Sequence, residues 1–174
     1  TVGYLMKLLK AAYGETVSDA ETLRARMYAK KEEIVQKDGF PQIPGVKEAI
    51  KRLHDEGFRL EVASSSAGYY IGRVLDALEI RQYFECYTSG EEVEHPKPAP
   101  DTFLRAMEKL NLKPEDCIIV EDSTNGGKAA AAAGAKCVWF HNPDSGDQQI
   151  PHAVLTITSW SPENVDKLID LMHA

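Results

Sequence analysis

The stretch from Cys117 to Gly134 restricts the fold more than any other part of the 174-residue chain. Its first four residues, Cys117-Ile118-Ile119-Val120, are apolar and mostly β-branched, which is typical of a buried strand in a parallel sheet. Glu121 and Asp122 follow this strand, and after a short polar turn an alanine-rich helix runs to Gly134. Because ligands of open α/β sheets bind beyond the carboxyl ends of the strands, the two carboxylates lie where chemistry is expected.

Two readings of this acidic pair are open from the stretch alone. Adjacent carboxylates repel each other unless a cation shares their charge, and hard oxygen ligands of this kind suit Mg²⁺. The same pair could instead cap the following helix by accepting hydrogen bonds from its free N–H groups. The rest of the chain has to decide between a metal site and a structural cap.

The pattern of the chain changes at the Gly- and Pro-rich stretch 37–45. Residues 1–43 predict helices, one near residues 2–12 and one that opens with Ser18 as N-cap and Glu21 as its capping-box partner. We interpret 1–43 as a separate helical piece, although ordinary surface helices without a functional role fit the same pattern. From 44 to 174, strands alternate with helices, which predicts an α/β fold with a parallel sheet and helices on both faces. The expected strands are 58–63, 86–89, 117–120, 136–140 and 153–157.

Composition narrows the partners and the compartment. The net charge of -7 and the pI near 5.3 argue against nucleic acid or an anionic membrane as the main partner. The three cysteines, Cys86, Cys117 and Cys137, have no metal-type spacing, which favours free thiols in a reducing cytoplasm. No apolar run is long enough to span a membrane. Oligomeric state cannot be predicted from these features.

Two further polar residues follow the strand pattern. Ser64 comes directly after the strand at 58–63, and Lys97 lies in the proline-flanked stretch 95–101. Taken alone, Ser64 is an ordinary helix N-cap and Lys97 an ordinary surface lysine. Together with Glu121 and Asp122 they supply a hydroxyl donor, an ammonium group and a carboxylate pair. These are the groups that a phosphoryl-transfer site requires.

Three stretches resemble motifs of the haloacid dehalogenase superfamily, in particular its subgroup with a helical cap. They are Val62-Ala63-Ser64-Ser65-Ser66, the stretch from Pro96 to Phe103, and the stretch from Ile119 to Gly126. The resemblance extends over nearly the whole chain. The subgroup includes β-phosphoglucomutases and small sugar- or glycolate-phosphate phosphatases. It implies a Rossmann-like three-layer core over 44–174 and a small helical cap to which residues 1–43 belong.

The resemblance also implies roles for individual residues. Ser64 would be the phosphate binder of the second motif and Lys97 the lysine of the third, both acting in catalysis. Glu121 and Asp122 would hold Mg²⁺. Further substrate contacts would come from Ser65, Ser66 and Asn125, and the substrate would be a small phosphorylated metabolite. The expected function is a Mg²⁺-dependent phosphohydrolase; a β-phosphoglucomutase-type mutase and a non-catalytic phosphate- or Mg²⁺-binding module are the alternatives.

One motif of the family is missing. The first motif, an apolar strand followed by Asp-x-Asp-Gly whose first Asp is the nucleophile, does not occur in the 174 residues. In the family's sheet that strand lies between the strand before Ser64 and the strand before Glu121. Without it, these two strands should face a gap one strand wide with unpaired backbone groups. We therefore expect a truncated chain that folds poorly alone.

Overall fold

The computed structural model describes residues 19–173, except for the side chains of Ala20 and Arg24. The helix predicted at 2–12, and Ser18, lie outside this part of the chain. The chain divides into two compact units, Thr1–Pro41 and Gln42–Ala174. In the first unit, helix α2 (Ala20–Asp38) begins one residue later than predicted. Its N-cap is Asp19, whose carboxylate accepts a hydrogen bond from the N–H of Thr22 at 2.7 Å. The predicted cap at Ser18 falls outside the described residues, and the N-cap that the structure describes is Asp19.

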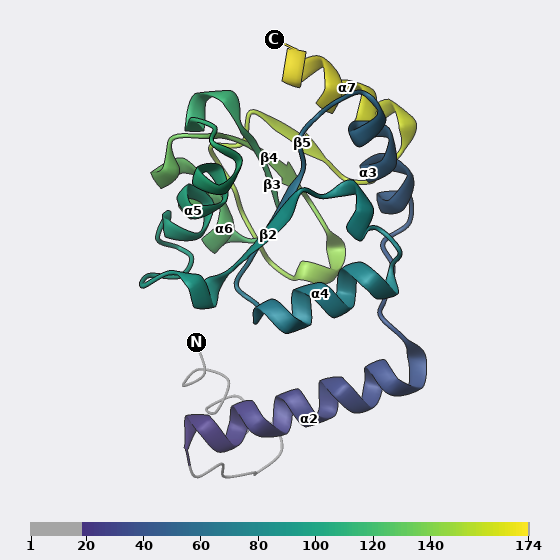
Figure 1. Ribbon diagram of the computed structural model, residues 1–174, viewed down its shortest axis with the longest axis vertical. Helices are drawn as coiled ribbons and strands as arrows, with labels where there is room; N and C mark the ends of the chain where they lie inside the picture. Colours follow the sequence, from purple (N-terminus) through teal and green to yellow (C-terminus); the bar gives the residue numbers. More distant parts are fainter. Residues whose placement is uncertain (1–18, 174) are drawn as a thin grey trace. The chain divides into compact units, whose positions relative to one another are not determined.

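The second unit alternates strands and helices, as the sequence predicted (Figure 1). Its strands are β1 (Glu61–Ser64), β2 (Cys86–Ser89), β3 (Ile118–Glu121), β4 (Lys136–Phe140) and β5 (Leu155–Ile157). Its α-helices are α3 (Val46–Asp55), α4 (Gly68–Ala77), α5 (Asp101–Leu110), α6 (Thr124–Ala133) and α7 (Pro162–His173). All strand pairs are parallel. The architecture is the predicted α/β, Rossmann-like one.

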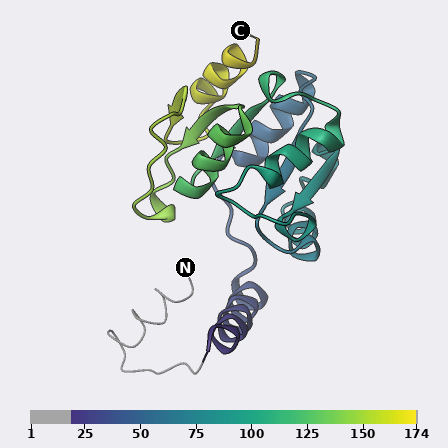
Figure 2. The same cartoon turned by 90° about the vertical axis from the view of Figure 1, so that its left-hand side faces the viewer.

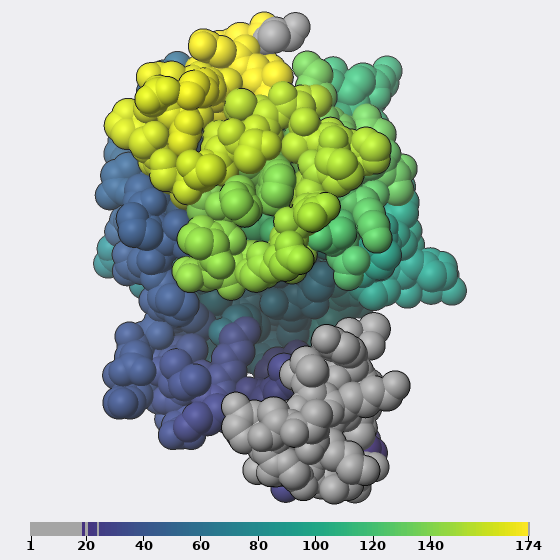
Figure 3. Space-filling model, turned by 180° about the vertical axis from the view of Figure 1, so that it is seen from behind, coloured from purple at the N-terminus to yellow at the C-terminus, as the bar shows by residue number. Residues whose placement is uncertain are grey.

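The strands are covered by helices on both faces. Helices α3 and α7 pack on one face with Val138, Phe140 and Ile157, and Figure 3 shows the yellow α7 against the blue α3 from behind. Helices α5 and α6 pack on the other face with Ile119 and Cys137, and they face the viewer in Figure 2. Alternate residues of one strand therefore enter different layers, which explains why these strands read as continuous apolar runs.

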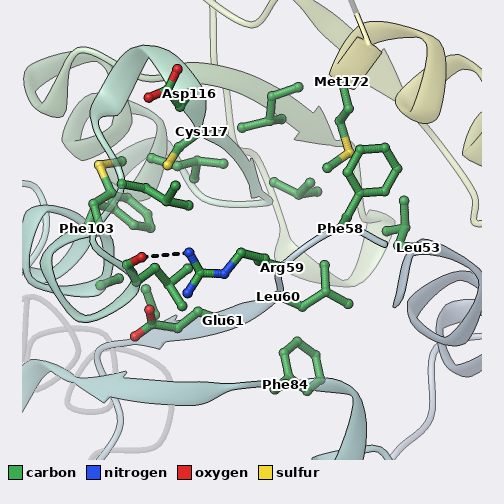
Figure 4. Close-up of a pocket in the computed structure, with 18 of the residues that line it drawn as sticks. Leu53, Phe58, Arg59, Leu60, Glu61, Phe84, Phe103, Asp116, Cys117 and Met172 are labelled. Carbon is green, nitrogen blue, oxygen red and sulfur yellow. Dashed lines mark hydrogen bonds between the residues drawn. The ribbon is translucent and has the colours of Figure 1, made fainter. Parts of the chain in front are cut away.

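The sheet is interrupted at the predicted place. Strands β1 and β2 form one sheet and β3, β4 and β5 form another, so β1 and β3 each have an edge that pairs with no other strand of the described chain. A cavity of about 490 Å³ lies between them, lined by Glu61 and Ala63 of β1 and by Ile118, Ile119 and Val120 of β3. Figure 4 shows this space between the two strands. The prediction of a gap beside the Ser64 and Glu121 strands is confirmed.

None of the helices in residues 19–173 is both long enough and apolar enough to cross a membrane.

Candidate functional site

The side chain of Lys97 joins the ends of the two separated strands. Its ammonium donates to the carbonyl oxygen of Ala63, near the end of β1, at 3.1 Å. It also donates to Oε1 of Glu121, the last residue of β3. The same nitrogen lies 4.2 Å from the centre of the Phe103 ring on α5. Because the side chains of Lys97 and Glu121 are each only 10% exposed, this is a buried ion pair with few competing water contacts.

The other oxygen of Glu121 is held by the turn that follows. Oε2 accepts from the backbone N–H groups of Asp122 and Ser123 at 3.2 Å and from the Ser123 hydroxyl at 2.9 Å. Gly126 leaves room for this carboxylate, because a Cβ at that position would lie 1.9 Å from the carboxyl carbon of Glu121. The Ser123 hydroxyl also caps α6 by accepting from the N–H of Gly126 at 3.0 Å. Capping of the helix is therefore done by Ser123, while Glu121 takes the N–H groups of the turn.

Asp122 points toward a different segment. Its Oδ2 accepts a hydrogen bond from the hydroxyl of Ser145, in the loop after β4. That loop is fixed to the start of α6, because Gln148 accepts from the N–H of Thr124 at 2.9 Å and donates to the Ser145 carbonyl at 3.0 Å. Asp122 is partly exposed. The two adjacent carboxylates thus have separate partners and do not share one.

Ser64, the last residue of β1, and the two serines that follow it lie at the carboxyl end of that strand. The Ser64 hydroxyl accepts from the N–H of Ser66 at 3.1 Å, and the Ser66 carbonyl accepts from the Ser89 hydroxyl at 2.8 Å. Ser65 is exposed, and Asn125 is exposed in the first turn of α6. Lys97 thus has direct contacts with Glu121 and with the residue before Ser64. No contact recorded for the described residues joins Ser65 or Asn125 to this cluster.

The fit to Mg²⁺ is partial. Among residues 19–173, no group of three or more His, Cys, Asp or Glu side chains is arranged to hold a metal ion. Asp122 offers a hard carboxylate oxygen at a partly exposed position, which suits Mg²⁺. Both oxygens of Glu121 already accept hydrogen bonds, so Glu121 could coordinate an ion only by sharing or exchanging them. Asp122 would be the main ligand from the described chain, and other ligands would have to complete the shell.

The sequence reasoning missed the contributions of Ser145, Gln148 and Phe103. In the sequence, Phe103 is only the last residue of the Pro96–Phe103 motif, and nothing in that motif indicates a ring beside an ammonium group. The positions of Ser145 and Gln148 could have been found from the sequence in one way. Both follow β4, and the loops after parallel strands meet at the same edge of the sheet.

The three cysteines are free thiols; Cys137 is buried and the other two are partly buried. Burial raises the pKa of Cys137 to about 11, and the nearby Glu121 charge acts in the same direction. Burial also raises the pKa of Cys86 to about 11. Both groups are therefore neutral at physiological pH and poor nucleophiles, so the chemistry of the site rests on the oxygen and nitrogen groups.

Comparisons with known proteins agree with this fold. A family model described as haloacid dehalogenase-like hydrolase matches residues 5–140. Hexitol phosphatase B from Escherichia coli (strain K12) is 32% identical over 115 residues, which cover 66% of this chain and 51% of that protein. Protein CbbY from Rhodobacter capsulatus is 33% identical over 157 residues, which cover 84% of this chain and 68% of that protein. The crystal structure of β-phosphoglucomutase from Clostridium difficile matches with a TM-score of 0.69 at 22% identity, covering 98% of this chain and 77% of that one.

The parallel strands, the flanking helices and the polar groups at their carboxyl ends define an α/β protein of Rossmann-like architecture. Within that class, the chain belongs to the haloacid dehalogenase-like hydrolases. It spans about half the length of several curated relatives that it matches.

Proposed function

We propose that this chain is part of a Mg²⁺-dependent phosphohydrolase that acts on a small phosphorylated metabolite. The observation that carries the proposal is the position of Lys97. Its largely buried ammonium contacts the end of β1 at the Ala63 carbonyl and the end of β3 at Glu121, and Asp122 is the next residue after Glu121. A fixed cation at a sheet edge can neutralise phosphoryl oxygens without reorganising during the reaction. The name of hexitol phosphatase B, a relative at 32% identity, supports a phosphorylated sugar or sugar alcohol as the substrate class.

Each residue has a proposed role. Lys97 and the Ser64 hydroxyl hold phosphoryl oxygens, assisted by the backbone around Ser65 and Ser66 near the start of α4. Bound Mg²⁺ supplies charge neutralisation at the phosphoryl group, and Asp122 holds it together with Glu121. Asn125 contacts the substrate from α6. The resemblance implies an attacking carboxylate from an Asp-x-Asp-Gly segment and an aspartyl-phosphate intermediate, and that segment does not occur in the 174 residues.

A second candidate is a non-catalytic module that binds phosphate or Mg²⁺, since the lysine and carboxylates of the site can hold either ion without a nucleophile. β-Phosphoglucomutase-type isomerisation uses the same core residues and is the enzymatic alternative. We also propose a cytoplasmic location, which the three free thiols support.

Hydrolysis of an aryl phosphate tests the proposal. The 174-residue chain is compared, with and without Mg²⁺, with a chimera in which the first strand and Asp-x-Asp-Gly of a relative precede residue 1. We expect Mg²⁺-dependent turnover by the chimera alone. Asp122→Ala should abolish it, and Asp122→Asn should be nearly as damaging because it removes the charge that holds the ion.

Asp55→Asn is the matched control, since Asp55 lies in an exposed ion pair on α3. A folded chimera that binds phosphate without turnover would support the binding module. Turnover by the 174-residue chain that disappears in Asp122→Ala would mean that the nucleophile has been misassigned.

A further inference from the structure

The loop formed by residues 141–150, after β4, is fastened to the first turns of α6. The side-chain oxygen of Gln148 accepts a hydrogen bond from the N–H of Thr124 at 2.9 Å, and the N–H of the following residue donates to the Thr124 hydroxyl at 2.9 Å. Ile150 is buried against the same helix, where a Cβ on Gly127 would lie 2.6 Å from its Cγ2 atom. Two polar contacts and one apolar contact therefore hold this loop to α6.

Hydrogen bonds within the loop fix the backbone of Ser145. Its N–H donates to the Asn142 carbonyl at 3.1 Å, and the Asn142 side chain accepts from the N–H of Asp144 at 3.1 Å. Its carbonyl accepts from the side-chain amide of Gln148 at 3.0 Å. Since both backbone groups of Ser145 are bonded inside the loop, its hydroxyl is presented from a fixed position.

That hydroxyl binds one of the two carboxylate oxygens of Asp122. It donates to Oδ2, and within residues 19–173 no hydrogen bond is made to Oδ1. Glu121 differs, because both of its oxygens accept hydrogen bonds. Asp122 thus combines one oxygen held by the protein with one oxygen that remains for a ligand. Carboxylates that bind metal ions are commonly held in this way by a neighbouring donor.

We propose that Ser145 is a positioning residue for Mg²⁺ coordination by Asp122. Its hydroxyl holds Oδ2 and leaves Oδ1 for the ion, so the carboxylate has little rotational freedom to lose when the ion binds. Ser145 contacts neither the ion nor the substrate and acts only through Asp122. The inference rests on the proposed function, because it takes Mg²⁺ as the ion of this site.

A purely structural role for the same hydrogen bond would be to hold the loop on the sheet. Gln148 and Ile150 already attach the loop to α6 without any contribution from Asp122. The two roles also predict different measurements. Loss of a structural bond lowers the free energy of unfolding, whereas loss of a positioning bond lowers the affinity for the ion.

The test measures Mn²⁺ binding by electron paramagnetic resonance, in which free Mn²⁺ gives the signal, with Mg²⁺ as competitor. Ser145→Ala, Ser145→Thr and Gln148→Ala are compared with the wild type, both in the 174-residue chain and in the Asp-x-Asp-Gly chimera. Urea unfolding gives the stability of each variant. Ser159→Ala is the matched control. The Ser159 hydroxyl lies in the loop after the neighbouring strand β5 and accepts from the Asn164 amide at 3.2 Å.

We expect Ser145→Ala to weaken Mn²⁺ and Mg²⁺ binding by about 10–100-fold, the usual cost of removing the partner of a ligating group. Ser145→Thr should keep most of the affinity, because it retains a hydroxyl. Gln148→Ala should cause a smaller loss, since it frees the Ser145 carbonyl without removing the hydroxyl. With Asp122→Ala already present, Ser145→Ala should cause no further loss, because its effect passes through Asp122. Ser159→Ala should bind as the wild type does.

Three results would overturn the proposal. Equal Mn²⁺ affinity of the wild type and Ser145→Ala would do so even if the chimera hydrolyses the aryl phosphate, and the proposed function would then stand alone. A loss of affinity that parallels a loss of stability and is not rescued by Ser145→Thr would make the bond structural. Absence of Mn²⁺ binding in both backgrounds would remove the proposed function as well. Ser145-dependent binding by a chimera without turnover would support the positioning role and contradict the phosphohydrolase.

Discussion

The space between β1 and β3 is closed by side chains at one end and open along its length. At the carboxyl end, Lys97 reaches the Ala63 carbonyl and Glu121, and each oxygen of Glu121 has a donor. Along the strands, no backbone bond crosses the gap, and Glu61 and Trp160 keep unpartnered polar atoms. Side-chain contacts can therefore join the ends of two strands whose backbones remain unpaired with each other.

The largest expected effect comes from removing the side-chain bridge. Lys97→Met should destabilise the fold by about 3–5 kcal/mol, because it leaves the buried Glu121 carboxylate without its cation. Urea unfolding monitored by circular dichroism measures this change. Adding Glu121→Gln should recover part of the loss, since the neutral amide still accepts from the turn and carries no buried charge.

Lys47→Met is the control for the bridge, because Lys47 forms an exposed ion pair with Glu79 and little change is expected. If Lys97→Met changed the free energy of unfolding as little as Lys47→Met, the contacts of Lys97 at the carboxyl ends of β1 and β3 would not hold the two strands together. The contrast between the two ends of the gap would then be lost.

A smaller effect is expected from filling the space beside Glu121. Gly126→Ala should cost about 1–3 kcal/mol, because its Cβ would lie 1.9 Å from the carboxyl carbon of Glu121 and neither group can move without breaking hydrogen bonds. Gly68→Ala is the matched glycine control at a helix start, where the closest atom to a new Cβ is 3.7 Å away. Thermal unfolding of both variants checks the prediction. An unchanged Gly126→Ala variant would show that the carboxylate is not fixed against the helix.

Much of the fold, and the meeting of Lys97, Glu121 and Asp122 at one sheet edge, could be predicted from the sequence. The strand before Glu121, the helix up to Gly134 and the loop with Lys97 are local patterns, and the order of a parallel sheet brings their ends together. The gap followed from the resemblance to a known sheet order, and not from any local pattern. The pairing of Lys97 with Glu121, the position of Ser145 and the N-cap at Asp19 could not be predicted, because each depends on the path of a side chain or on a shift of one residue.

The smallest expected effect is a pH dependence of stability caused by Glu61, which lines the gap between β1 and β3. Burial raises the pKa of the Glu61 carboxyl above its ordinary value, although the hydroxyl of Thr88 and the charge of Lys109 oppose the shift. The folded protein therefore binds this proton more tightly than the unfolded chain does. The sign follows from linkage: stability falls as pH rises from the ordinary pKa of a glutamate through the raised pKa of the folded state.

Glu61→Gln removes this ionisation and should be more stable than the wild type by an amount that grows as pH rises through that interval. Urea unfolding of both proteins between pH 4 and pH 8 measures the difference at each pH. Glu92→Gln is the control of opposite sign, because a hydrogen bond from Lys109 lowers the pKa of Glu92. Its variant should lose stability at neutral pH relative to the wild type, and that loss should disappear in acid. If the difference in unfolding free energy between Glu61→Gln and the wild type instead shrank as pH rose, the ionised Glu61 carboxylate would be stabilised in the folded protein. The gap between β1 and β3 would then not leave this carboxylate without a partner.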